Sequence, residues 1–84
     1  MEERSKVKVL ESLLNGAESV EEITRDTGLS EFLIRRVLFS LESQGIVERE
    51  KEGDRTLWHV REDREKMVKD LIDLWRRKKN GQKS

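Results

Sequence analysis

The segment from residue 19 to residue 60 constrains the fold of this chain most, because its cap residues and glycines divide it into short elements. Ser19 is a typical N-cap residue, and Glu22 three positions later completes a capping box. Gly28 ends this helix, since glycine accepts the left-handed conformation that closes helices. Ser30 then caps the next helix along the chain. The pattern predicts two helices joined by a glycine turn.

Two segments with strand character follow these helices. The helix capped by Ser30, the third of the chain, is expected to continue through Gln44 and to stop at Gly45. Ile46 to Glu50 and Arg55 to Val60 then read as antiparallel strands, and the polar loop between them contains the glycine that a hairpin needs. Alternation along the second strand places Trp58 and Val60 on one face, and Leu57 and His59 on the other.

An amphipathic helix is predicted on each side of this segment. The first spans about residues 3–15, and its apolar face comprises Val7, Leu10, Leu13 and Leu14 with Val9 beside them. The last runs from about Asp63 to Lys79, and its apolar stripe is too wide for an exposed appendage: Met67, Val68, Leu71, Ile72, Leu74 and Trp75. We therefore expect a mostly helical α+β domain over residues 1–62 and an added helix with a basic tail over residues 63–84.

Composition excludes several function classes. The 84 residues include no cysteine and one histidine, so neither a disulfide nor a multi-histidine or thiolate metal site is expected. No phosphate-binding glycine loop or nucleophile motif is present, which argues against an enzyme and against a cofactor. The chain has no apolar run of membrane-spanning length, and its first residues do not resemble a signal peptide, so a cytoplasmic location is expected. Abundant Glu, Lys and Arg are typical of thermophile surfaces.

The net charge of zero conceals an asymmetry along the chain. Residues 1–45 carry six basic and nine acidic side chains, whereas residues 46–84 carry twelve basic and nine acidic ones. The last nine residues contain five cations and no acid: Arg76, Arg77, Lys78, Lys79 and Lys83. Such a tail can contact phosphates, and it equally suits a solvated helix end, because cations favour helix C-termini.

From Gly28 onward the chain resembles winged helix-turn-helix transcription regulators of the ArsR-like and MarR-like kind. The shared pattern is a Gly-Leu-Ser turn, spaced apolar residues, and Leu-Glu-x-x-Gly followed by Ile or Leu and Val. It occurs here as Gly28-Leu29-Ser30, Ile34, Leu38 and Leu41-Glu42-Ser43-Gln44-Gly45-Ile46-Val47, with Trp58 as the aromatic residue of the second wing strand. The resemblance covers about residues 7–60. It implies a three-helix core with a β-wing, and a third helix that enters the major groove of DNA.

The resemblance assigns the base-reading face to the third helix. By position this face comprises Ser30, Glu31, Phe32, Leu33, Arg35, Arg36 and Phe39. The two arginines suit the role, because a guanidinium pairs bidentately with guanine or clamps a phosphate. The apolar residues depart from the family pattern, in which these positions are usually polar. They either contact thymine methyl groups, form a protein-binding surface or, for Leu33 and Phe39, enlarge the core.

Further phosphate contacts are expected from the wing and the second helix. Arg49, Lys51 and Arg55 are the wing candidates, and the alternative for them is a cross-strand salt-bridged ribbon with the neighbouring acids. Arg25 is the candidate on the second helix, and its alternative is an ion pair with Glu21 or Glu22. His59 is expected to be a partly packed strand residue without a site role.

The last helix resembles the dimerisation helices of these regulators. Its apolar stripe would form the centre of a homodimer interface, while the alternative packs it on the first helix of the same chain. The sequence thus favours a dimeric regulator that binds double-stranded DNA. The competing hypothesis is a winged helix that binds a protein partner in a larger assembly, with Phe32, Leu33 and Phe39 as anchors.

Overall fold

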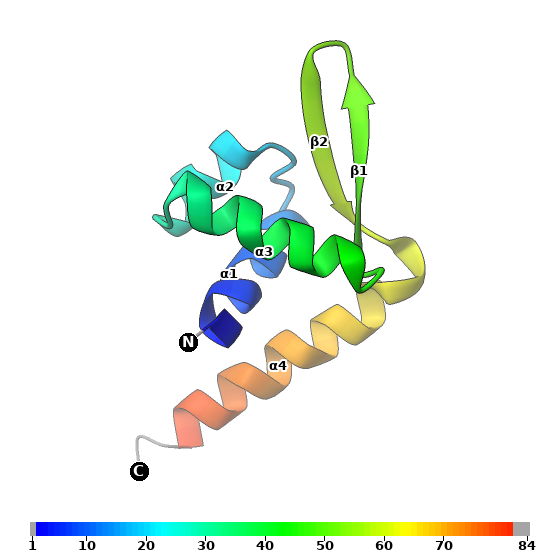
Figure 1. The fold of residues 1–84 in the computed structure, drawn as a ribbon. Helices are drawn as coiled ribbons and strands as arrows, with labels where there is room; N and C mark the ends of the chain where they lie inside the picture. Colours follow the sequence, from blue (N-terminus) through cyan, green and yellow to red (C-terminus); the bar gives the residue numbers. More distant parts are fainter. Residues whose placement is uncertain (1, 82–84) are drawn as a thin grey trace.

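The computed structural model describes residues 2–81, which form four α-helices, a two-stranded sheet and one short 3-10 turn (Figure 1). In chain order the elements are α1 (Glu2–Leu14), α2 (Val20–Thr27), α3 (Glu31–Ser43), β1 (Val47–Glu52), β2 (Arg55–Val60), the 3-10 turn Glu62–Arg64 and α4 (Glu65–Gly81). This architecture confirms the predicted mostly helical α+β fold with a hairpin and an added C-terminal helix.

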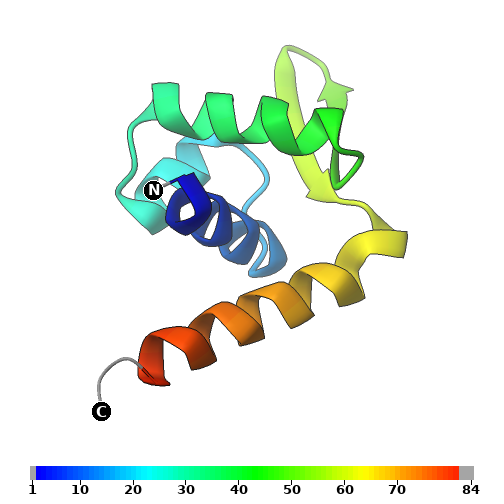
Figure 2. The ribbon, with the colours of Figure 1, turned by 60° about the horizontal axis from the view of Figure 1, so that its bottom comes forward.

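The first helix is the centre of the fold. α1 packs against α2 and α3 on one side and against α4 on the other, so that α3 and α4 lie on opposite sides of it (Figure 2). Val7, Val9, Leu10 and Leu13 of α1 are all buried, as the helical spacing predicts. The rest of the core comes from Ala17, Ile23, Ile34, Val37, Leu38, Leu41, Ile46, Val47, Trp58, Val60, Val68 and Ile72.

The hairpin extends away from the helices, and only its base joins the core (Figure 1). The strands are antiparallel, and Val47 pairs with Val60 at the base while Glu52 pairs with Arg55 at the tip. β1 therefore begins one residue later and ends two residues later than expected, and the predicted four-residue loop shortens to a turn that contains Gly53, which has a φ of +64°. The ladder extends through the loop residues because glycine at the turn allows a two-residue connection.

The last helix packs along α1 of the same chain. Val68 and Ile72 are buried in the common core, and Arg76 forms an ion pair with Glu11 of α1. α4 begins at Glu65, two residues later than expected, because a 3-10 turn precedes it. Among the described residues, no helix is both long and apolar enough to cross a membrane. Lys83 of the predicted basic tail lies outside the described residues, as does the side chain of Lys79.

Candidate nucleic-acid interface

Helix caps fix where α3 begins and how it leaves α2. The capping box forms as predicted: the backbone N–H of Glu22 donates to Ser19 Oγ at 3.1 Å, and the backbone N–H of Ser19 donates to the Glu22 carboxylate at 3.2 Å. Gly28 closes α2 in the left-handed conformation, with a φ of +74°. Ser30 Oγ then accepts a hydrogen bond from the backbone N–H of Leu33 at 3.2 Å. Ser30, which was predicted to contact DNA, is therefore the N-cap of α3 and remains exposed.

Two faces of α3 differ completely in burial. Ile34, Val37, Leu38 and Leu41 are buried on the inner face. The outer face carries the predicted base-reading residues, all of them exposed: Glu31, Phe32, Arg35, Arg36 and Phe39. Leu33 lies between the two faces and packs against the core. Arg35 is 3.7 Å from Glu31 across one helical turn, which is a loose, solvent-exposed ion pair.

The two phenylalanines have different surroundings. Phe32 is 77% exposed, the most exposed large apolar side chain among the described residues. Phe39 is 48% exposed, and its ring lies 6.0 Å from that of Trp58 on β2, tilted by 59°. Phe39 thus neither joins the core nor stands alone, because it forms an aromatic contact with the hairpin.

A hollow of about 320 Å³ lies between α3 and the hairpin. One wall comes from Glu31, Arg35 and Phe39, which recur every four residues along α3. The remaining lining comes from the start of α2 and from the hairpin: Ser19, Val20, Glu21, Arg49, Asp54, Arg55, Thr56 and Trp58. The outer face of α3 and the hairpin therefore form one concave surface that mixes arginines, carboxylates and two aromatic rings.

Arg49 of β1 is tied to α3. Its Nε and Nη2 donate to the two carboxylate oxygens of Glu42 at 2.9 and 2.8 Å, a bidentate pair. Its guanidinium carbon lies 5.3 Å from the centre of the Phe39 ring and 5.1 Å from that of Trp58. We refer to these four residues, Arg49, Glu42, Phe39 and Trp58, as the Arg49 clamp.

The clamp stabilises the charged form of both ionisable partners. Hydrogen bonds from Arg49 lower the pKa of the Glu42 carboxyl, and those same bonds raise the pKa of the Arg49 guanidinium. Arg49 was predicted either to contact phosphate or to pair across the hairpin. In the structure, its guanidinium pairs with the Glu42 carboxylate on α3 and not with an acid across the hairpin.

The other basic candidates are exposed. Lys51 and Arg55 lie near the tip of the hairpin, and Arg25 lies on α2. The capping hydrogen bonds from the backbone of Glu18 and Ser19 lower the pKa of Glu22, and the nearby charge of Arg55 adds a smaller effect in the same direction. Among the described residues, the hairpin shows one cross-strand contact between polar side chains, from His59 Nε2 to Glu50 Oε1 at 2.8 Å. The predicted cross-strand ribbon of paired side chains is thus limited to that pair.

The predicted dimer residues on α4 divide into two groups. Val68 and Ile72 are buried within the same chain, and Leu71 and Trp75 pack partly against the core. Met67 and Leu74 remain 41% and 62% exposed. The wide apolar stripe of this helix therefore has an inner edge that completes the core and an outer edge that faces solvent.

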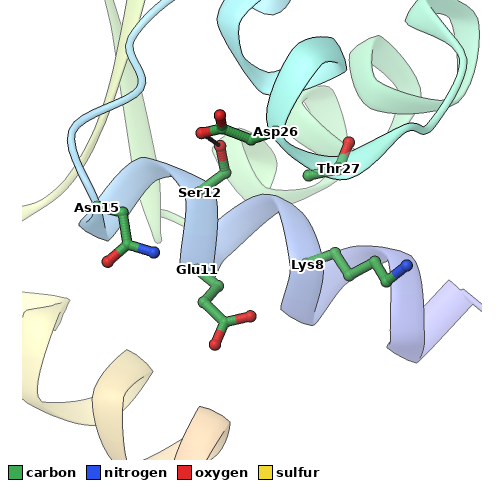
Figure 3. Close-up of a pocket in the computed structure, with 6 residues that line it drawn as sticks. All are labelled: Lys8, Glu11, Ser12, Asn15, Asp26 and Thr27. Carbon is green, nitrogen blue, oxygen red and sulfur yellow. Dashed lines mark hydrogen bonds between the residues drawn. The ribbon is translucent and has the colours of Figure 1, made fainter.

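A second hollow lies between α1 and α2 (Figure 3). It is open and polar, and its lining residues include Lys8, Asn15 and Thr27. Ser12 Oγ donates to Asp26 at 2.9 Å across it, while Glu11 points away from Asp26. Among the described residues, no group of three His, Asp or Glu side chains could hold a metal ion. We assign this hollow a packing role, since its one cross-helix hydrogen bond joins α1 to α2.

Comparisons with known proteins agree with this geometry. The backbone superimposes on the Bordetella bronchiseptica protein BpsR, whose DNA binding is regulated by 6-hydroxynicotinic acid, with a TM-score of 0.82 at 14% identity over 92% of this chain and 58% of that one. It also matches a homodimeric winged helix-turn-helix DNA-binding domain from Mycobacterium bovis, a possible ArsR-family regulator, with a TM-score of 0.65 at 29% identity over 89% of this chain and 67% of that one. The chain is a winged helix-turn-helix protein. The resemblance inferred from sequence is confirmed at this level.

The sequence of this chain is also similar to that of a longer curated protein. Transcription factor E of Nanoarchaeum equitans is 31% identical over 78 residues, which are 90% of this chain and 56% of that protein. The chain thus spans little more than half of the curated relative that it matches. Comparison with protein-family profiles gives no match.

Sequence reasoning missed one residue of the winged-helix surface. Glu42 was noted only as part of the Leu-Glu-x-x-Gly pattern, although both of its carboxylate oxygens accept hydrogen bonds from Arg49. The two residues are seven apart and separated by the turn at Gly45, so no helical or strand period connects them. The charge complementarity of Glu42 and Arg49 on either side of that turn was the available signal.

Proposed function

We propose that this chain is a transcription regulator that binds double-stranded DNA, with α3 in the major groove and the wing against the backbone. The observation that carries the proposal is the exposed pair Arg35 and Arg36 on a helix whose opposite face is buried. A major groove about 12 Å wide admits an α-helix, and arginine is the residue that most often reads guanine there. The matched Mycobacterium bovis domain is named as DNA-binding, which supports the same role.

The other candidates take supporting roles in this proposal. Lys51 and Arg55 near the tip of the wing, and Arg25 on α2, are exposed cations that can reach phosphates on either side of the groove. Ser30 and Glu31 lie at the start of α3, where backbone N–H groups face outward. Arg49 is not included among the phosphate contacts, because Glu42 already holds two of its five N–H groups.

A titration of duplex DNA by fluorescence anisotropy at two salt concentrations tests the proposal. Replacing both Arg35 and Arg36 by Ala should weaken binding by tenfold or more, since each arginine–guanine contact is worth about 1–3 kcal/mol, and the binding that remains should still weaken with salt through the phosphate contacts. Lys66→Ala with Lys69→Ala is the matched control, because it removes two exposed cations from α4. Absence of wild-type binding at low salt, or equal losses in both double variants, would refute the proposal.

We further propose that the regulator is a homodimer paired through the outer edge of α4. Met67 and Leu74 are exposed, and Leu71 lies between them at the spacing of one continuous stripe. Two copies of α4 placed antiparallel about a two-fold axis between Leu71 and Leu74 bring Leu71 of each against Leu74 of the other. This apolar contact is self-complementary, as a two-fold interface requires. The homodimeric state named for the Mycobacterium bovis domain supports the pairing.

Light scattering tests the dimer directly. The monomer mass is 10.0 kDa, so the mass measured for a dimer should be twice that value. Leu74→Glu should return the protein to monomer without unfolding it, because Leu74 is 62% exposed. Lys69→Glu is the control on another face of the same helix. A wild-type mass equal to that of the monomer across the micromolar range contradicts the pairing.

The alternative function is a winged helix that binds a protein partner, and the exposure of Phe32 is the observation in its favour. A solvated phenylalanine at the start of α3 suits an apolar anchor better than a phosphate contact. Phe32→Ala distinguishes the two functions in the same titration. DNA affinity should be nearly unchanged in this variant if the arginines carry binding, and a loss as large as that of the double arginine variant would reverse the assignment.

A further inference from the structure

The wing needs a support beyond its own two strands. An isolated two-stranded hairpin is marginal in water, and this one extends away from the helices (Figure 1). In β1 only Val47 at the base is buried, and every residue from Glu48 to the tip is exposed. The backbone N–H of Trp58 donates to the carbonyl of Glu18 at 2.8 Å, which fixes one side of β2. Beyond that point, the position of the wing depends on side chains.

The Arg49 clamp is the side-chain contact that joins the wing to α3. Arg49 is the third residue of β1 and pairs in register with Trp58 on β2, so its guanidinium lies over the residue directly across the ladder. The same guanidinium covers Phe39 and holds both oxygens of Glu42, one turn further along α3. One side chain thereby contacts both strands of the wing and two turns of the helix.

We propose that Arg49 is a positioning residue, which together with Glu42, Phe39 and Trp58 holds the wing at a fixed distance from α3 so that both reach the DNA together. This inference rests on the proposed DNA-binding function. Glu42 holds two of the five N–H groups of Arg49 and the two rings cover its planar face, so this proposal assigns Arg49 no phosphate contact of its own. Its contribution to affinity is made through the geometry of the wing.

If Arg49 positions the wing, Glu42→Gln should change DNA affinity in the opposite direction to that expected if Arg49 contacts a phosphate. Removing a negative charge beside a DNA-binding surface should strengthen binding if electrostatics alone acts. The same change weakens the charge-assisted hydrogen bonds that hold Arg49, so binding should weaken if the clamp sets the position of the wing. Glu48→Gln is the matched control, since it removes an exposed carboxylate from the neighbouring position of β1.

The experiment combines DNA affinity with amide hydrogen exchange of the wing, measured by NMR on the full chain. Glu42→Gln and Arg49→Lys should each weaken binding by about two- to fivefold, the upper part of the range expected of an exposed ion pair. Arg49→Lys keeps the charge, so its salt slope should stay at the wild-type value. Glu48→Gln should bind as tightly as wild type or slightly tighter. Combining Glu42→Gln with Arg49→Gln should cost no more than Arg49→Gln alone.

Several outcomes overturn the inference. Tighter binding by Glu42→Gln, or full binding by Arg49→Lys, shows that Arg49 does not act through Glu42. Failure of the proposed function is distinguishable, because exchange of the wing amides is measured without DNA. If wild type binds no duplex, the clamp still requires faster exchange of the wing amides in Glu42→Gln and Arg49→Lys than in Glu48→Gln. Equal exchange in all three variants refutes the clamp.

Discussion

The last helix and the wing flank the same three-helix body, but they are attached to it by different physical means. α4 buries Val68 and Ile72 in the core shared with α1, and its polar contact with Glu11 lies outside that core. The wing buries Val47 of β1 and Leu57, Trp58 and Val60 of β2, and the Arg49 clamp adds a polar contact with α3. The attachment of α4 is mainly apolar, whereas that of the wing combines the buried residues of one strand with a local polar contact.

The difference separates stability from positioning. Burial of apolar side chains is roughly proportional to the area removed from water, so α4 should contribute strongly to the free energy of unfolding. An exposed ion pair contributes about 0–1 kcal/mol, so the clamp should contribute little to global stability. It can still determine where the wing lies, because local opening of one element need not unfold the rest. Changes in α4 should thus alter stability, and changes in the wing should alter binding.

The largest expected effect is on stability and lies in α4. Ile72→Ala should lower the free energy of unfolding by about 2–4 kcal/mol, because the side chain is 5% exposed and its removal leaves a cavity against α1. Urea denaturation followed by circular dichroism measures the change. Leu74→Ala is the control on the same helix, and its cost should stay below about 1 kcal/mol, as usual for exposed sites. The two variants should be compared at protein concentrations too low for dimer formation. Equal losses in the free energy of unfolding would remove the distinction between the two edges of α4.

A smaller effect is expected at the tip of the wing. Gly53 has a φ of +64°, and a Cβ built there would meet no atom within 4 Å, so backbone conformation alone opposes substitution. Gly53→Ala should cost roughly 1 kcal/mol locally, whereas Gly53→Asn should be nearly neutral, because asparagine tolerates the left-handed region. Exchange of the amides of Glu50 and Leu57, which pair across the ladder near the tip, should report the loss, with the urea midpoint almost unchanged. A shift of the midpoint as large as that of Ile72→Ala would show that the wing is part of the cooperative core.

Much of the fold could be predicted because its signals are local. The capping box at Ser19, the N-cap at Ser30 and the left-handed glycine at Gly28 each act within a few residues, and all are present in the structure. The inner face of α3 follows from helical periodicity in the same way. The errors concern lengths: β1 continues to Glu52, and α4 begins after a 3-10 turn. Both depend on how the chain turns, which local propensity determines poorly.

The candidate surface was less predictable, because it depends on contacts between elements. Periodicity placed six apolar residues on one stripe of α4 but could not tell that Val68 faces α1 while Leu74 faces solvent. Similarly, the sequence left open whether Phe39 packs in the core or binds a partner. In the structure, its ring contacts Trp58 and Arg49. The arginines of α3 were identified correctly as exposed, since their neighbours at Ile34 and Val37 define the inner face.

The smallest expected effect is a pH dependence of the wing. Hydrogen bonds from Arg49 lower the pKa of Glu42 below the ordinary value of 4.5 in the folded protein. A carboxyl whose folded pKa is lowered stabilises the fold above its unfolded pKa, and this stabilisation is lost as the pH falls through the folded value. The clamp should therefore be fully formed at neutral pH and should weaken in acid, at a pH below the ordinary carboxyl value of 4.5.

Exchange protection of the wing amides, corrected for intrinsic rates, should fall from neutral to acidic pH in wild type and change less in Glu42→Gln. The two proteins should converge at the acidic end, because protonation of Glu42 removes the same charge as the substitution. Glu22, whose pKa is lowered mainly by the backbone hydrogen bonds of Glu18 and Ser19, is present in both proteins, so its effect cancels in the difference. Protection of the amides around Val68 should follow the same course in both proteins, because the attachment of α4 does not depend on the clamp. Wing protection that falls equally in wild type and Glu42→Gln would assign the pH dependence to the cap of α2, and the clamp would lose its part in it.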